Sequence, residues 1–260
     1  MLVRVHPISP ISPISPIRPI PLSLPAMSEA AKAELLRALG RLVRGLSTLF
    51  WGLAVTGLIY LEMVYLETAQ MLSRQTFRPA AFLPAFLVSP LLWHGLNQLR
   101  AFQAQERIWQ RALSRAEILA VLDAGLAPFL YWWHKFPAVP LYAACVGLLL
   151  LSSLFLLVQI NCVLERLCAM LPDETLRAET KLFTAFNVSL LAALLAGLLL
   201  YFLLTRLPIL PGWLALRMDV AGAGGIWLAL FLLLMALAMT MALLWKIKEV
   251  IFSSLTTPGP

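Results

Sequence analysis

One carboxylate, Asp123, stands in the apolar stretch Ile118–Trp133, with Pro128 close behind it. An ionisable side chain inside a membrane-spanning helix is costly, which makes it a functional candidate by default. We expect Asp123 to act as a protonatable or cation-binding carboxylate, or to pair with an arginine or hydrogen-bond across helices as a structural group. Further polar or ionisable candidates in apolar stretches are Glu62, His94, Asn97, Asn161 and Asn187.

The usual signatures of catalysis are missing from the sequence. It contains no H-E-x-x-H, no G-x-S-x-G and no Walker loop. The cysteines Cys145, Cys162 and Cys168 form no C-x-x-C pair, and no second histidine lies at metal spacing from His94. We therefore expect no metal site, no cofactor and no enzymatic activity, although a site assembled from distant helices stays open.

Composition decides the physical class of the chain. Of 260 residues 61% are hydrophobic and 13% are charged, whereas about a quarter are charged in soluble domains. The apolar residues come in blocks separated by charge clusters, which is typical of membrane spans. The net charge of +7 comes from basic residues at the ends of these blocks, where they would meet anionic lipid headgroups, so nucleic-acid binding is disfavoured.

Two apolar runs, Ala138–Leu164 and Leu182–Thr205, contain no Asp, Glu, Lys or Arg and are joined by the charged hinge Glu165–Lys181. Each is longer than the roughly 20 residues that a helix needs to cross a bilayer. They predict a membrane hairpin within an all-α integral membrane protein, a polytopic helical bundle. The expected six spans cover residues 46–66, 79–99, 118–134, 138–164, 182–205 and 226–245.

The third span is the ambiguous one, because it is short and contains Asp123 and Pro128. If it crosses the membrane, nearly all basic clusters fall on one side, as the positive-inside rule requires. If it only lies in the interface, that asymmetry weakens. We therefore favour six spans with both termini inside, and keep five spans plus an interfacial helix as the alternative.

The ends of the chain differ in composition from the bundle, which we place at residues 46–252. Residues 1–27 contain an Ile-Ser-Pro repeat, which predicts a disordered tail or an incorrectly assigned start upstream of Met27. Residues 28–45 predict an amphipathic lead-in helix, and residues 253–260 a disordered end.

Several local patterns add detail. Pro84 and Pro90 should kink the second span, and Arg100–Arg115 should continue from it as a basic amphipathic helix along the membrane surface. Arg206–Gly225 is rich in Pro and Gly and predicts an outer loop. Two stripes of small residues predict close helix packing; they are Thr48, Gly52 and Thr56, and Ser189, Ala193 and Gly197.

These features favour a non-enzymatic multi-pass protein of the cell membrane (the inner membrane in a Gram-negative bacterium) that helps to assemble, anchor or regulate a partner. Its expected partners are anionic headgroups of the lipid bilayer and a membrane or soluble protein. The candidate inner-face contacts are Arg107, Arg111, Arg115, Asp173, Glu174 and Arg177. The alternative is a small-solute or ion permease that uses a protonatable carboxylate, because broken helices and buried carboxylates are typical of such pathways.

Overall fold

The structure is a computed structural model of the chain. It describes the backbone of residues 29–72, 83–100, 102, 106–136, 138–171, 174–206 and 212–256. Within these ranges it describes the side chains of residues 33–34, 36–65, 86–100, 102, 106–136, 138–171, 174–200 and 224–253. The proline-rich segment 1–27, Asp173 and the start of the expected second span lie outside the described residues.

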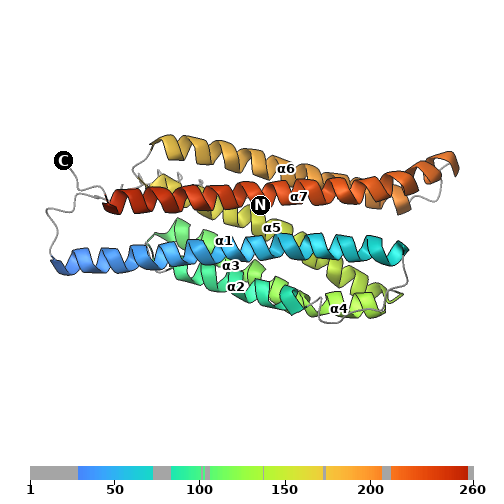
Figure 1. The fold of residues 1–260 in the computed structure, drawn as a ribbon, viewed down its shortest axis with the longest axis horizontal. Helices are drawn as coiled ribbons and strands as arrows, with labels where there is room; N and C mark the ends of the chain where they lie inside the picture. Colours follow the sequence, from blue (N-terminus) through green and yellow to red (C-terminus); the bar gives the residue numbers. More distant parts are fainter. Residues whose placement is uncertain are drawn as a thin grey trace, which may run out of the picture.

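All regular secondary structure in the described residues is α-helix, so the predicted all-α bundle is confirmed (Figure 1). Six of the helices form a closed ring, in which α1 packs on α2, α2 on α3, α3 on α5, α5 on α6, α6 on α7 and α7 on α1. The short helix α4 packs on α5 beside the ring. In chain order the helices are α1 (Glu29–Leu72), α2 (Leu83–Arg100), α3 (Arg107–Leu126), α4 (Pro128–Lys135), α5 (Pro140–Met170), α6 (Glu174–Arg206) and α7 (Gly212–Thr256).

Neighbouring helices in the ring run antiparallel. Figure 1 shows the start of α1, the end of α5, the start of α6 and the end of α7 at one end of the bundle. Side-chain contacts agree, since the rings of Phe50 in α1 and Trp245 in α7 are 6.0 Å apart and Lys246 of α7 pairs with Glu179 of α6. We call this end, which holds the start of α1, the α1-start end.

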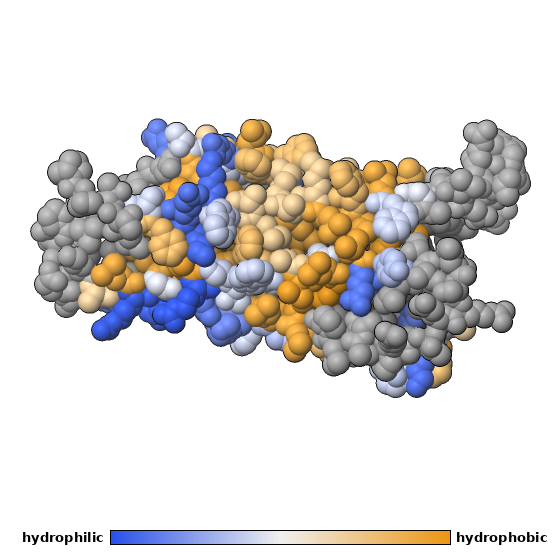
Figure 2. Space-filling model, viewed as in Figure 1, coloured by the Kyte–Doolittle hydropathy of each residue, from blue (hydrophilic) through white to orange (hydrophobic). Residues whose placement is uncertain are grey.

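Four helices are long and apolar enough to cross a membrane, and they lie in α1, α5, α6 and α7. The apolar stretches cover Leu36–Tyr65, Pro140–Met170, Glu174–Leu200 and Gly224–Ser253. Figure 2 shows a broad apolar middle and hydrophilic side chains gathered towards the α1-start end. The chain is therefore all-helical with four candidate membrane-spanning helices, so four of its six expected spans meet this criterion within the described residues.

The first helix joins two elements that the sequence suggested separately. The lead-in helix and the first span form one uninterrupted helix, α1. Its buried face follows the helical repeat and consists of Leu39, Leu42, Leu46, Leu49 and Leu53. Because this stripe continues through the predicted boundary near residue 45, nothing ends the helix there.

Glycines let α1 and α2 approach closely. A Cβ added to Gly52 would lie 2.7 Å from the Leu92 Cδ2 atom, and one added to Gly95 would lie 3.0 Å from the Leu49 side chain. Thr48 and Thr56 donate their hydroxyls to backbone carbonyls of their own helix. The predicted small-residue stripe of α1 therefore packs against α2 through its glycine.

The prediction that Arg100–Arg115 continues from the second span as one helix is wrong, although residues 107–115 do form an amphipathic helical segment with exposed arginines. α2 ends at Arg100, the chain turns where the Phe102 N–H donates to the Leu99 carbonyl, and Arg107 begins α3. Phe102 and Trp109 are both buried, with their rings 6.5 Å apart, so the turn is held by the apolar core. The basic segment thus belongs to the same helix as Asp123.

The expected outer loop needs correction, and so does the kink expected at Pro84. Pro84 lies in the first turn of α2, where a missing N–H costs no intrahelical bond, whereas Pro90 lies inside α2 and removes one intrahelical bond, so a kink at Pro90 stays a prediction. Helix α7 already begins at Gly212, within the expected loop Arg206–Gly225, and extends to Thr256 beyond the expected end. Its glycines are accommodated because membrane helices tolerate glycine better than soluble helices do.

The hinge Glu165–Lys181 is mostly helical. α5 continues to Met170 and α6 begins at Glu174, so Leu171 is the one non-helical residue among the hinge residues that the structure describes. α6 therefore starts in the charged segment, ahead of the apolar run Leu182–Thr205.

We expect Gly45→Ala to destabilise the bundle. The new Cβ would lie 2.5 Å from Leu99 Cδ1 and 3.0 Å from the Gly95 carbonyl oxygen, and such overpacking costs about 1–3 kcal/mol. In a background in which Cys145 and Cys162 are replaced by alanine, a thiol-reactive fluorescent dye that detects exposure of the buried Cys168 should report a lower unfolding midpoint in detergent. Gly147→Ala, which meets nothing within 4 Å, is the control; equal midpoints for the two variants would contradict the close packing.

Candidate functional site

The Asp123 carboxylate is 4% exposed and lies between α3 and α5. Its Oδ1 atom accepts a hydrogen bond from the Ser152 hydroxyl, and its Oδ2 atom accepts one from the Ser153 hydroxyl at 3.0 Å. Tyr60 of α1 hydrogen-bonds to Ser153 and interacts electrostatically with Asp123. Three helices therefore meet at one carboxylate.

The helical repeat explains why Asp123 is buried. The buried face of α3 steps by four and three residues through Trp109, Leu113, Ala116, Ala120 and Asp123. Asp123 thus occupies a core position, and the small residues one and two turns before it leave α3 close to its neighbours. It lies about 12 Å along the helix from Arg115.

A second polar cluster joins α5, α6 and α7 through Asn161, Asn187 and Thr240. The Asn187 amide nitrogen is 2.9 Å from Thr240 Oγ1 and 3.2 Å from Asn161 Oδ1. The Asn161 amide nitrogen is 3.0 Å from Thr240 Oγ1, and the threonine hydroxyl donates to the Ala236 carbonyl at 2.9 Å. The structure thus brings together two residues that the sequence singled out, and adds Thr240.

The buried face of α6 is unusually polar beside this cluster. Thr180, Thr184 and Asn187 are all buried on it. The Thr180 hydroxyl lies 3.3 Å from the Cys168 sulfur, whereas Thr184 Oγ1 and Asn187 Oδ1 have no hydrogen-bond partner among the described residues. Such atoms are commonly satisfied by buried water.

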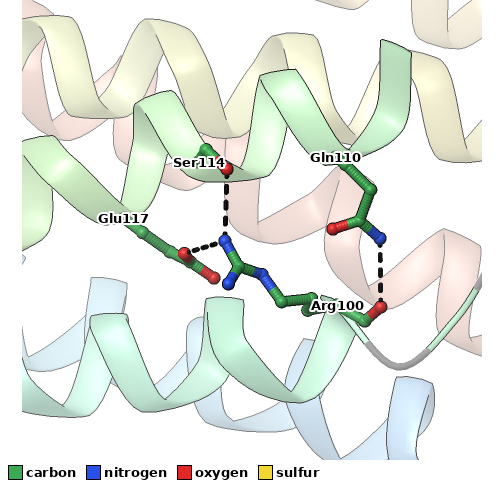
Figure 3. Close-up of polar contacts among 4 residues, drawn as sticks. All are labelled: Arg100, Gln110, Ser114 and Glu117. Atoms are coloured by element: carbon green, nitrogen blue, oxygen red, sulfur yellow. Dashed lines mark hydrogen bonds and ion pairs between the residues drawn. The ribbon is translucent and has the colours of Figure 1, made fainter. Parts of the chain in front are cut away.

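An ion pair joins the end of α2 to α3, beside the turn between them (Figure 3). The Arg100 guanidinium donates to Glu117 Oε2 at 2.6 Å and to the Ser114 hydroxyl at 3.1 Å, and the Gln110 amide donates to the Arg100 carbonyl at 3.2 Å. Burial raises the pKa of the Glu117 carboxyl, and Arg100 opposes that shift. Removing Arg100 would leave a nearly buried carboxylate without its counter-ion, which is costly.

The predicted contact residues are exposed. Arg107, Arg111 and Arg115 follow one another by one turn along α3, with their side chains exposed. Glu174 and Arg177 lie exposed in the first turn of α6, where the Arg177 side chain donates to the Ala169 carbonyl of α5. Asp173 lies outside the described residues.

The remaining predicted site residues do not come together. Glu62 and Asn97 are exposed. His94 is exposed and its Nε2 atom lies 2.7 Å from the Gln98 amide nitrogen, one turn further along α2. No group of three His, Cys, Asp or Glu side chains able to hold a metal occurs among the described residues.

Sequence reasoning missed Tyr60, Ser152, Ser153 and Thr240 as partners of these sites. Single hydroxyl residues are common in membrane helices, and several here bond to their own backbone, as Ser152 also does to the Leu149 carbonyl. The only feature of the sequence that could have indicated Thr240 is its position as a single polar residue within the apolar stretch Ala236–Leu244.

Comparison with known proteins supplies no relative: no protein-family model matches the chain, and no match was found among curated proteins or solved structures. The function must therefore be argued from the geometry of the chain itself.

We expect Thr240→Val to lower the free energy of unfolding by about 1 kcal/mol, because both asparagine amides lose an acceptor. Refolding from mixed micelles measures this change. The loss in Thr240→Val with Asn187→Ala together should be smaller than the sum of the two single losses, since the residues share one network. Ser189→Ala on the exposed side of α6 is the control, and strict additivity of the pair would argue against the network.

Proposed function

We propose that this chain is a six-crossing protein of the cell membrane, with both ends on the inner side, that assembles, anchors or regulates a partner without catalysing a reaction. The observation that carries the proposal is a change in the exposed side chains near the α1-start end. On several helices these side chains change from basic to apolar at about the same level along the bundle, which defines a plane.

Helix α3 gives the clearest view of this change. Its exposed stripe carries Arg107, Arg111 and Arg115, and continues with Ile118, which is 68% exposed, and Leu122. Arginine suits the headgroup region and an exposed isoleucine suits the acyl chains. α3 is therefore best explained as a helix that enters the membrane between Arg115 and Ile118.

Other helices change character in the same part of the bundle. Arg44 precedes the exposed Trp51 on α1, and Lys181 precedes the exposed Leu182 and Phe183 on α6. The contacts Arg100–Glu117, Phe50–Trp245 and Glu179–Lys246 join neighbouring helices close to these changes. One membrane surface at this level accounts for all of them.

The distance beyond this plane suits a crossing by α3 and α4 together. From Ile118 to Lys135 the helical rise amounts to about 26 Å, near the thickness of the hydrocarbon layer. Lys135 ends this path, with its Nζ atom 5.5–5.9 Å from the ring centroids of Tyr131, Trp132 and Phe136. Aromatic rings beside a lysine are typical of a membrane interface.

Charge then sets the orientation. Arginines and lysines lie at the start of α1, α3 and α6 and at the end of α2, α5 and α7, all at the α1-start end. At the opposite end the described helices carry Lys135, Arg206 and Arg217. The positive-inside rule therefore assigns the α1-start end to the inner side.

An assembly role follows from how the polar groups are used. Asp123, Asn161, Asn187 and Thr240 bond between helices. Arg107, Arg111 and Arg115 have no carboxylate partner among the described residues, so their charge remains for anionic lipid headgroups or an acidic protein surface.

A permease is the second candidate. It is favoured by the buried carboxylate one turn before the break between α3 and α4, where Pro128 cannot donate to the Ala124 carbonyl.

Topology can be tested with single cysteines in a variant whose native cysteines are replaced. We expect Lys135→Cys to react with a membrane-impermeant maleimide from outside intact cells, and Glu174→Cys to react only after the membrane is opened. Both parent side chains are exposed, so a lack of reaction reflects sidedness. Labelling of both positions from the same side would make α4 interfacial and refute six crossings.

The assembly role is testable by crosslinking in native membranes. A photoreactive phenylalanine analogue in place of Arg111 should give one discrete protein adduct. The same analogue in place of Leu148, an exposed residue of the apolar run of α5, should give lipid adducts only. Lipid adducts alone at both positions would contradict a protein partner at Arg111 and would leave contact with lipid headgroups as the role of this surface.

A further inference from the structure

We propose that Asp123, Ser152, Ser153 and Tyr60 together bind one monovalent alkali cation, such as sodium, between α1, α3 and α5. The inference goes beyond the proposed function, because six crossings and an assembly role require no ion. It concerns the polar cluster around Asp123.

The first argument is charge. The two ion pairs among the described residues involve Glu117 and Glu179, so Asp123 has no arginine or lysine partner there. An ionised carboxylate that is 4% exposed is strongly unfavourable in a low-dielectric interior. Two hydroxyl donors lessen the cost without cancelling the charge. The group must therefore be neutralised, either by a proton or by a cation.

The second argument is the set of ligands. Two carboxylate oxygens and two serine hydroxyls meet between α3 and α5, and the phenol hydroxyl of Tyr60 on α1 hydrogen-bonds to one of these serines, Ser153. Hard cations prefer such all-oxygen surroundings. A single positive charge balances Asp123, whereas a divalent ion would leave one uncompensated charge in the membrane interior. The requirement for charge balance at Asp123 therefore favours a monovalent ion.

The third argument is that one of the hydroxyls has another acceptor. The Ser152 hydroxyl also reaches the Leu149 carbonyl at 3.0 Å. When its hydrogen points to that carbonyl, the oxygen lone pairs face the carboxylate and are available to a cation. The serine can thus switch from donor to ligand without leaving its position.

The test uses the protein purified in detergent, with Cys145 and Cys162 replaced by alanine in every sample, and follows unfolding by the reaction of a dye with the buried Cys168. At equal ionic strength and fixed pH, we expect the midpoint to rise with NaCl concentration and saturate, while choline chloride has no such effect. Binding to the folded state alone produces this dependence. Comparison with KCl and LiCl measures the selectivity.

Variants test whether the sodium-dependent rise of the unfolding midpoint depends on Asp123 and Ser153. Asp123→Asn should abolish the sodium-dependent rise, and Ser153→Ala should shift the half-saturating sodium concentration upwards by about tenfold, equivalent to roughly 1.4 kcal/mol. Glu117→Gln is the matched control, because it removes the other buried carboxylate of α3, and it should retain the full sodium response.

Three outcomes would overturn the proposal. The first is a wild-type midpoint that is the same in NaCl and choline chloride. The second is a midpoint that depends on pH but not on sodium, which would mean that a proton neutralises Asp123. The third is an undiminished sodium response in Asp123→Asn. If that variant does not fold, binding of radioactive sodium to the wild type and to Ser153→Ala decides the question.

Discussion

A polar group buried among apolar helices must find its partner within the protein, and this constraint governs the described part of the structure. It makes every described element a helix, because a helix satisfies its own backbone. It also explains where the buried side chains go. Asp123 bonds to serines of α5, and Asn161 and Asn187 bond to each other and to Thr240. Each polar cluster ties together helices that are distant in sequence, so it fixes their rotation as well as their proximity.

The long apolar helices could be predicted from the sequence, whereas the turn after α2 could not. Apolar length alone identifies α5, α6 and most of α7. The segment Ala101–Glu106 has neither Gly nor Pro, so no helix-breaking residue in the sequence predicts that α2 ends at Arg100. The chain turns there because Phe102 and Trp109 enter the core and Arg100 reaches Glu117. Contacts between segments decide this turn.

The candidate site was predictable only in part, for a related reason. Asp123, Asn161 and Asn187 are conspicuous by type, since carboxylates and amides are rare in spans. Their partners are ordinary serine, threonine and tyrosine residues, whose roles appear only when the helices are assembled. The two small-residue stripes likewise differ in role in a way that only the assembled helices show. Gly52 on α1 contacts α2, whereas the stripe of α6 faces outwards, and a Cβ added to its Gly197 would meet nothing within 4 Å.

The unbroken course of α1 has a mechanical consequence. From Glu29 to Leu72 this helix measures about 65 Å, roughly twice the thickness of the hydrocarbon layer. It packs against α7, a helix of similar length. Neither contains a loop that could absorb a displacement. A push or twist applied at the α1-start end is therefore carried as rigid-body motion to the far end of α1, which makes the pair of helices a rigid link along the length of the bundle.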